Sequence, residues 1–321
     1  MKTILLRLIC AWILFYGQSG AAQEYPYKSI RVIVTSAAGS GIDIASRMVA
    51  QHLSDAWKQP VVVDNRVGAS GQIGGSIVSK AAPDGYTILV VSPVFLISPH
   101  LYANIPYDFV KDFAPIVRIG KTPYVMVVNP AVAATSIAEF VSLAKTRPGK
   151  INYGSNGSGT IMHLAGELLK SSAKIDIVHV PYKSSPQVVT DVVGNRVEMM
   201  FNSVTLLAPF IKDGKLRAVG MGSENRSLLF PNIPTFAESG FKGFDVASWY
   251  GFVAPARTPH PVLAKLQREI SAFANSGPGK EKLMAMGTEP INETSDEFSA
   301  MIKDEMNRYG RVIKAAGVTV D

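Results

Sequence analysis

Two glycine- and serine-rich turns are the segments of this chain whose residue types and spacing could do chemistry. The stretch YGSNGSGTIMHLAGELL (153–169) and the stretch TSAAGSGID (35–43) each follow a strand pattern and open into an apolar helical pattern. Glycine lets a ligand approach the backbone, and the first turn of a helix presents unpaired N–H groups with a partial positive charge. Two such turns facing one cleft would bind an anion from both sides, whereas either alone could be a plain helix-entry turn.

The spacing of the glycines excludes the common nucleotide-binding motifs. No G-x-x-x-x-G-K-[ST] occurs, and the glycines at 68, 71 and 74 and at 154, 157 and 159 do not match G-x-G-x-x-G. The serine of a hydrolase elbow, G-x-S-x-G, is also absent.

Candidate catalytic and metal-binding residues are few. His163 and Glu167 are four residues apart, which places both on one helix face, but no second histidine or cysteine lies nearby in the sequence. His179 alternates with apolar residues on a predicted strand and is interpreted as structural. An exported hydrolase using Ser155 or Ser158 with His163 remains an alternative. The Gly, Ser, Thr, Asn and Tyr of the turns suit ligand binding and do not form a complete catalytic set. We therefore expect that the protein is not an enzyme and that it binds no metal and no cofactor.

The elements around these turns alternate between β-branched runs and helical patterns, which predicts an α/β protein with parallel sheets and right-handed crossovers. The first series has strands at 29–35, 60–65 and 86–92 and helices at 43–57 and within 67–82. The second has helices from the Ser136/Glu139 capping box to 145, at 160–172 and at 185–194, and strands at 151–155, 175–182, 197–203 and 215–222. Helices at 262–275 and from the Thr294/Glu297 capping box to about 316 close the chain.

Long extended runs at 112–130 and 244–256 separate the two series and predict two lobes joined by two crossings, near 117–124 and 247–253. Lobe 1 then comprises residues 23–121 and 250–321, and lobe 2 comprises 122–249. Such a hinged clamshell holds ligands in the cleft at the carboxyl ends of the strands. Tyr182 and Asn202 end two strands and could reach that cleft, while Trp249 and Tyr250 either pack in the core or form a cleft wall.

The N-terminal segment has the pattern of a secretory signal peptide, residues 1–22. Lys2 and Arg7 precede an apolar run at 8–16 that is too short to span a bilayer, and small residues follow it. The only cysteine, Cys10, lies in this segment, which excludes a thiol nucleophile, a cysteine metal site and a disulfide beyond it. The formal net charge of +7 is scattered along the chain, which disfavours nucleic acid and suits small anions. We expect a soluble periplasmic monomer.

Ten collinear phrases, covering essentially all of the chain beyond that segment, resemble the Bug-type receptors. These are the extracytoplasmic solute-binding proteins of tripartite tricarboxylate transporters. Among the phrases are YPYKSIRVIV, QPVVVDNRVGASGQIGG, AAPDGYTILV, PGKINYGSNGSGTIMHLAGE, VHVPYK, PNIPTFAESG and SWYGFVAPARTP. The resemblance implies a two-lobed periplasmic binding-protein fold of the type II kind, each lobe a βα sandwich, that closes on a small carboxylate. It also implies delivery to membrane permease subunits, or in some members to a sensor protein.

Carried over by this resemblance, the binding site uses both turns and further strand ends. The expected ligand-binding residues are Ala38, Gly39, Ser40, Gly41, Asp43, Ser92, Ser155, Asn156, Gly157, Ser158, Gly159, Thr160, Tyr182 and Asn202. The first turn departs from the family pattern P-G-G-x-x-D, with Ala38 in place of the proline and Ser40 in place of the second glycine. Ser184 replaces the glycine of Y-K-G, and Asn202 replaces the aspartate of F-D-N. The loss of that aspartate makes an amino-acid ligand less favoured, since an ammonium group would need a carboxylate partner.

Overall fold

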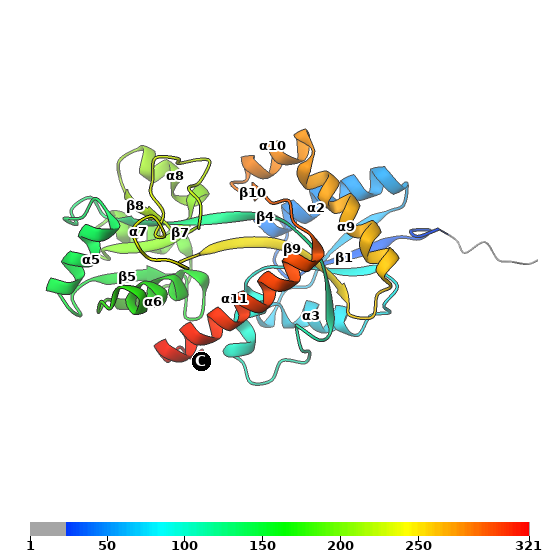
Figure 1. The fold of residues 1–321 in the computed structure, drawn as a ribbon, viewed down its shortest axis with the longest axis horizontal. Helices are drawn as coiled ribbons and strands as arrows, with labels where there is room; N and C mark the ends of the chain where they lie inside the picture. Colours follow the sequence, from blue (N-terminus) through cyan, green and yellow to red (C-terminus); the bar gives the residue numbers. More distant parts are fainter. Residues whose placement is uncertain (1–23, 321) are drawn as a thin grey trace, which may run out of the picture.

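The computed structural model describes residues 24–320, so the predicted signal peptide lies outside the described residues. Two α/β lobes lie side by side, and two long strands run from one lobe to the other (Figure 1). One continuous path of strands, in the order β2-β1-β3-β9-β4-β7-β5-β6, connects both lobes. The predicted two-lobed α/β architecture is confirmed.

Lobe 1 is built on the parallel strands β1 (Ile30–Val34), β2 (Val61–Asn65) and β3 (Thr87–Val91). Successive side chains of a strand face opposite sides, so Val32 packs under α2 (Gly41–Trp57) and α9 (His260–Asn275), while Ile33 packs under the helices of the other face. That other face carries η1 (Ala69–Gly71), α3 (Gln72–Ser79), α4 (Val94–Ile97), η2 (Ser98–His100) and α11 (Ser295–Ala316).

Lobe 2 holds the strands of the second series. They are β5 (Asn152–Ser155), β6 (Val178–Pro181), β7 (Met199–Ser203) and β8 (Arg217–Met221). Its helices are α5 (Ile137–Thr146), α6 (Ile161–Ala173), α7 (Ser185–Val193) and α8 (Val204–Lys212). Strand β5 runs parallel to β6 and β7. At its carboxyl end the chain enters the turn that leads into α6.

The two crossing strands are β4 (Phe113–Val128) and β9 (Ala247–Pro255). They pair antiparallel from Phe113 opposite Pro255 to Pro123 opposite Ala247, and from Tyr124 onwards β4 pairs with β7 and β8 of lobe 2. The predicted crossings near 117–124 and 247–253 lie within this pair.

Several elements differ from the sequence predictions. Helix α8 was missed because it begins with Val204 and Thr205 and contains Pro209, residues that favour strands or interrupt helices. Helix α10 (Gly277–Ala285) was missed because two glycines and a proline stand in its first turn. A short strand, β10 (Glu289–Pro290), pairs with β4. The helix predicted within 67–82 covers only 72–79, and the strand predicted at 175–182 covers only 178–181.

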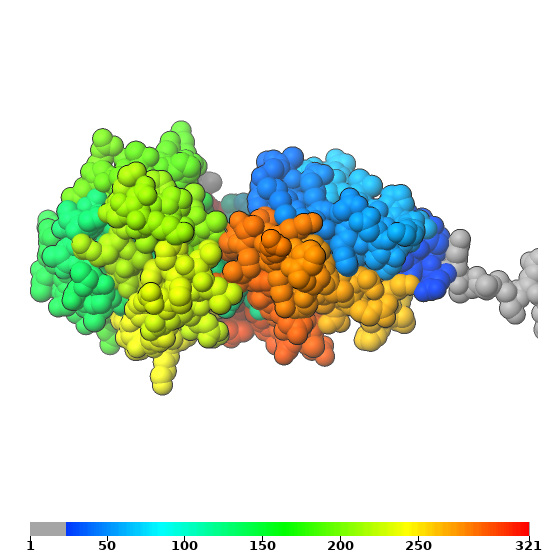
Figure 2. Space-filling view, turned by 90° about the horizontal axis from the view of Figure 1, so that it is seen from above, coloured from blue at the N-terminus to red at the C-terminus, as the bar shows by residue number. Residues whose placement is uncertain are grey.

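The lobes also contact each other beyond the crossing strands. Tyr309 and Ile313 of α11 share a buried cluster with Leu164 of α6, so the last helix of lobe 1 packs against lobe 2. On another edge Glu289 accepts hydrogen bonds from the Ser227 hydroxyl at 2.9 Å and the Leu228 N–H at 3.0 Å. Figure 2 shows the orange segment of lobe 1 lying against the yellow-green segment of lobe 2.

Candidate ligand-binding site

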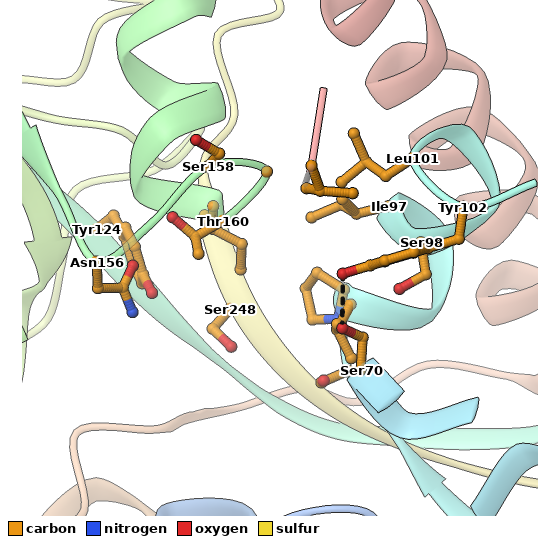
Figure 3. Close-up of a pocket in the computed structure, with 16 residues that line it drawn as sticks. Ser70, Ile97, Ser98, Leu101, Tyr102, Tyr124, Asn156, Ser158, Thr160 and Ser248 are labelled. Atoms are coloured by element: carbon orange, nitrogen blue, oxygen red, sulfur yellow. Dashed lines mark hydrogen bonds between the residues drawn. The ribbon is translucent and has the colours of Figure 1, made fainter. Parts of the chain in front are cut away.

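A cavity of about 260 Å³ lies between the lobes, on the side of the crossing strands that carries α4 and α6 (Figure 3). Its lining is Ser70, Ser92, Pro93, Val94, Ile97, Ser98, Leu101, Tyr102, Tyr124, Asn156, Ser158, Gly159, Thr160, Ile161, Ser248 and Val320. No charged side chain belongs to this lining within residues 24–320.

The lobe 2 wall is the turn between β5 and α6. Thr160 is the N-cap of α6: its hydroxyl accepts from the His163 N–H at 3.4 Å and donates to the Gly157 carbonyl at 2.8 Å. The backbone N–H groups of Ile161 and Met162 donate to no acceptor in the described part of the chain. These N–H groups and the dipole of α6 favour an anion at this end of the cavity.

Two stacked histidines hold this turn from behind. His163 Nδ1 accepts from the Gly159 N–H at 3.1 Å, and His179 Nε2 lies 2.6 Å from the hydroxyl oxygen of the fully buried Ser155. The two imidazole centroids are 3.7 Å apart with an interplanar angle of 7°. Burial lowers the pKa of each to about 4, so both rings are neutral at pH 7 and His163 can act as an acceptor.

Further ionisable groups surround the histidine pair. The Tyr153 hydroxyl donates to Glu167 Oε1 at 2.6 Å, and Lys170 Nζ donates to the same oxygen at 3.0 Å. Glu167 Oε1 lies 3.9 Å from His163 Nε2. The Glu167 carboxylate therefore accepts hydrogen bonds from two donors and does not belong to the cavity lining.

The lobe 1 wall combines hydroxyls with an apolar surface. Tyr102 and Ser70 hydrogen-bond to each other through their hydroxyls at 3.1 Å, and Ser98 lies beside them (Figure 3). Ser70 stands in a run of left-handed residues, with φ of 135° at Gly68, 46° at Ala69, 51° at Ser70 and 87° at Gly71. Positive φ angles cost free energy for residues other than glycine, here Ala69 and Ser70, and this backbone conformation places Ser70 on the cavity wall.

The crossing strands supply the back of the cavity through Tyr124 of β4 and Ser248 of β9. Burial raises the pKa of the Tyr124 hydroxyl well above its usual value, with a smaller contribution from Tyr250. The hydroxyl is therefore a permanent donor at physiological pH. Because both residues lie on the strands that join the lobes, a change in lobe angle moves the two walls relative to this back surface.

The first turn lies next to the crossing strands but outside the cavity lining. Asp43 is 1% exposed and accepts from the Gly39 N–H at 2.9 Å, from Arg47 Nε at 3.0 Å and from Asn65 Nδ2 at 2.8 Å. Burial opposes ionisation of Asp43, but these hydrogen bonds outweigh it and lower the pKa of its carboxyl. Since a Cβ on Gly41 would lie 2.8 Å from the Tyr250 hydroxyl, the turn closely borders the return crossing.

With this geometry established, comparison with known proteins decides the family. Residues 45–318 match the family model described as tripartite tricarboxylate transporter family receptor. The chain belongs to this receptor family. It is 33% identical over 318 residues to protein BugT of Bordetella pertussis, covering 97% of this chain and 98% of BugT. A UPF0065 protein from the tcbD-tcbE intergenic region of Pseudomonas sp. strain P51 is 34% identical over 290 residues, covering 90% and 86% of the two chains.

Solved structures agree with the two-lobed periplasmic binding-protein fold of this receptor. Rpa4515 of R. palustris with adipate has a TM-score of 0.75 at 31% identity, covering 92% of this chain and 99% of that one. The periplasmic binding protein BugD has a TM-score of 0.71 at 31% identity, covering 92% and 99%. MatC of Rhodopseudomonas palustris with bound malate has a TM-score of 0.70 at 25% identity, covering 90% and 100%.

The structure brings five of the predicted site residues of the receptor together in the cavity. They are Ser92, Asn156, Ser158, Gly159 and Thr160. Ser155 and Gly157 lie behind them, within the hydrogen bonds that shape the turn. The Tyr182 hydroxyl donates to Asp191 at 2.8 Å on the outer side, and Asn202 is 4% exposed with its amide nitrogen 3.6 Å from Met162 Sδ.

Sequence reasoning missed much of the lobe 1 wall. Ser98 and Tyr102 belong to or follow short helical turns that the sequence pattern did not reveal, and Ser70 could have been noticed through the neighbouring glycines. Of the two aromatic residues left open on the return crossing, Trp249 is a core residue, 1% exposed, whose Nε1 donates to Glu305 at 2.9 Å. Tyr250 is half-buried beside the first turn.

The described residues hold no group of three or more His, Cys, Asp or Glu side chains with metal-binding geometry. The Ser155 hydroxyl lies beside an imidazole, but Ser155 is fully buried and the imidazole is His179, not His163. His163 Nδ1 is already engaged by the Gly159 N–H, so neither proposed serine has the exposed Ser–His pair that an exported hydrolase would need. Between residues 24 and 320, no helix is long and apolar enough to cross a membrane.

Proposed function

We propose that this chain is a periplasmic receptor that captures a small organic carboxylate in the interlobe cavity by hinge closure. The observation that carries the proposal is the pair of free N–H groups at the start of α6, facing a cavity whose two walls belong to different lobes. Rpa4515 with adipate and MatC with bound malate, two proteins of similar structure, support a carboxylate ligand. The predicted signal peptide supports export, and membership of the family supports delivery to permease subunits.

In this proposal the carboxylate lies at the α6 N-terminus, in contact with Asn156, Ser158, Gly159 and Thr160. Ser92 contacts the ligand from lobe 1, and the first turn, Ala38 to Gly41, approaches it on further closure. Asp43 acts indirectly, since its carboxylate already accepts three hydrogen bonds that fix the first turn. Ser155, Gly157, Tyr182 and Asn202 shape the lobe 2 wall.

Ligand-dependent stabilisation tests the proposal. A ligand present at 100 times its dissociation constant adds about 2.7 kcal/mol to the free energy of unfolding. For a chain of this size we expect a melting temperature several degrees higher in the presence of a bound acid. No stabilisation by any acid in a broad panel of mono-, di- and tricarboxylates and aromatic acids would refute the proposal.

A pair of N-cap variants separates binding from folding. Thr160→Ala removes the N-cap of α6 in the cavity, and Ser136→Ala removes the equivalent N-cap of α5 away from it. Each should cost about 1 kcal/mol of stability, but only Thr160→Ala should weaken ligand binding. An equal effect of the two variants on the dissociation constant would contradict the proposed position of the carboxylate.

The family resemblance leaves two partners open, permease subunits or a sensor protein. Uptake of the identified ligand in cells lacking this chain distinguishes them. Delivery to a transporter predicts that uptake is lost, whereas a sensing role predicts normal uptake with loss of ligand-dependent gene expression.

A further inference from the structure

The interlobe cavity is lined by hydroxyls, one amide and apolar side chains, and its chemistry differs between its two ends. At the lobe 2 end, the N–H groups of Ile161 and Met162 are free to bind one carboxylate. At the lobe 1 end, Val94, Ile97 and Leu101 form an apolar surface that also carries hydroxyl groups. One end is therefore suited to an anion and the other to an apolar group.

The hydroxyl of Ser98 is the distinctive group of the lobe 1 end. Ser98 is only 2% exposed, yet its hydroxyl has no hydrogen-bond partner among residues 24–320, and the residue lines the cavity. Figure 3 shows it beside the paired hydroxyls of Ser70 and Tyr102. The Ser98 oxygen is not one of the fully buried side-chain atoms that lack a partner, which in the described part of the chain are His52 Nε2 and Asp245 Oδ1, so it opens onto the cavity and is free to hydrogen-bond a ligand.

We infer that the ligand is a singly charged carboxylic acid with an apolar body that bears a neutral hydrogen-bonding substituent, such as a hydroxyl, at the end remote from the carboxylate. This inference rests on the proposed function. The carboxylate lies at the start of α6, the apolar body packs against Ile97 and Leu101, and the substituent hydrogen-bonds to Ser98.

A second carboxylate does not fit the lobe 1 end. A second carboxylate would exchange its hydration for hydroxyl groups only, since no lysine, arginine or histidine between residues 24 and 320 lines the cavity to balance its charge. The hydrogen bond between Ser70 and Tyr102 already uses one of the O–H groups of these two residues. Adipate and malate each carry two carboxylates. The ligand preference of this chain should therefore differ from that of the proteins whose structures contain these two acids.

Calorimetric titration of the purified protein with matched acids tests the inference. The pairs are benzoate with terephthalate and hexanoate with adipate, each differing by one carboxylate. We expect the monoacid of at least one pair to bind at least tenfold more tightly than its diacid, and one hydroxybenzoate isomer to bind about fivefold more tightly than benzoate. If a diacid binds as tightly as its monoacid or more tightly in both pairs, the inference is wrong and the proposed function stands. If none of these acids binds, and no acid of the broad panel of mono-, di- and tricarboxylates and aromatic acids binds either, the inference and the proposed function both fail.

A serine variant locates the neutral substituent. Ser98→Ala should reduce the affinity for the preferred hydroxybenzoate to that for benzoate, and it should leave the affinity for benzoate within twofold of wild type. Ser171→Ala, at an exposed position of α6 remote from the cavity lining, is the matched control and should change neither affinity. An equal loss for benzoate and hydroxybenzoate in Ser98→Ala would show that Ser98 does not recognise the substituent.

Discussion

The stacked pair of His163 and His179 predicts a stability change with pH that a single substitution can isolate. In the native state His163 must be neutral, because its Nδ1 accepts from the Gly159 N–H and its ring lies 3.7 Å from that of His179. The charged groups around the pair are Glu167 and Lys170 of α6, and Lys170 already disfavours protonation. Protonation of His163 Nδ1 in acid would therefore break the hydrogen bond from the Gly159 N–H that holds the turn.

The magnitude follows from the pKa of His163, which burial lowers from 6.5 to about 4. Between these values the unfolded chain binds a proton that the native chain does not, so the free energy of unfolding falls as the pH falls. The loss is about 1.4 kcal/mol per pH unit for one group, or about 3 kcal/mol between pH 7 and pH 4. Below about pH 4 the native ring also takes up the proton, and this contribution no longer changes.

His163→Asn is the informative variant, since an Asn side-chain oxygen can accept from the Gly159 N–H but does not titrate. Urea denaturation followed by tryptophan fluorescence at pH 7, 5.5 and 4 gives the free energy of unfolding for both proteins. Wild type should lose about 3 kcal/mol more than His163→Asn over this range, whatever their difference at pH 7. Parallel losses would refute the reasoning, because they would mean that His163 is not held neutral by its surroundings.

Two further predictions concern packing between and within the lobes. Arg308→Met removes the cation 3.1 Å from the buried Glu305 carboxyl, whose pKa burial raises to about 7 even with Arg308 present. Without Arg308 this pKa should rise further, so the cost of the variant in urea denaturation should be larger at pH 8 than at pH 7, by up to about 1.4 kcal/mol. Equal costs at the two pH values would contradict the buried-charge argument. Gly166→Ala should lower stability by at least about 1–3 kcal/mol, because the new Cβ would lie 2.2 Å from the Tyr153 ring. Gly277→Ala, with open space at its Cβ, should stay within about 0.5 kcal/mol, and a similar melting temperature for both glycine variants would count against this packing.

Local sequence signals predicted the order of elements well. The Thr294/Glu297 capping box starts α11 at Ser295, and the glycine that follows Ala316 ends it in a left-handed conformation. Ser136 caps α5 as the predicted capping box implied, and Ser40 and Thr160 cap α2 and α6 close to their predicted starts at residues 43 and 160. These predictions succeeded because caps, turns and hydrophobic periodicity depend on residues a few positions apart.

The predicted site was harder to place, because the direction of a side chain at a strand end depends on distant neighbours. Asp43 and Tyr182 are polar residues next to the predicted cleft, yet their side chains are occupied by Arg47 and Asp191 respectively. Ser98, by contrast, carries no motif. It reaches the cavity because α4 and η2 turn the chain towards the opposite lobe.

The sequence by itself therefore determined the two α/β series, the extended crossings and the glycine-rich turn that opens α6. The sequence has no thiol beyond Cys10 and no recognised catalytic motif. Its residue types therefore also indicated binding rather than catalysis. Only the tertiary structure decided which wall faces that turn. The lobe 1 surface of Ser98, Leu101 and Tyr102 is more than fifty residues away from the turn in the sequence, and the crossing strands bring the two together. Local patterns specify elements and caps, whereas the contents of a cleft depend on how two separately folded cores are held against each other.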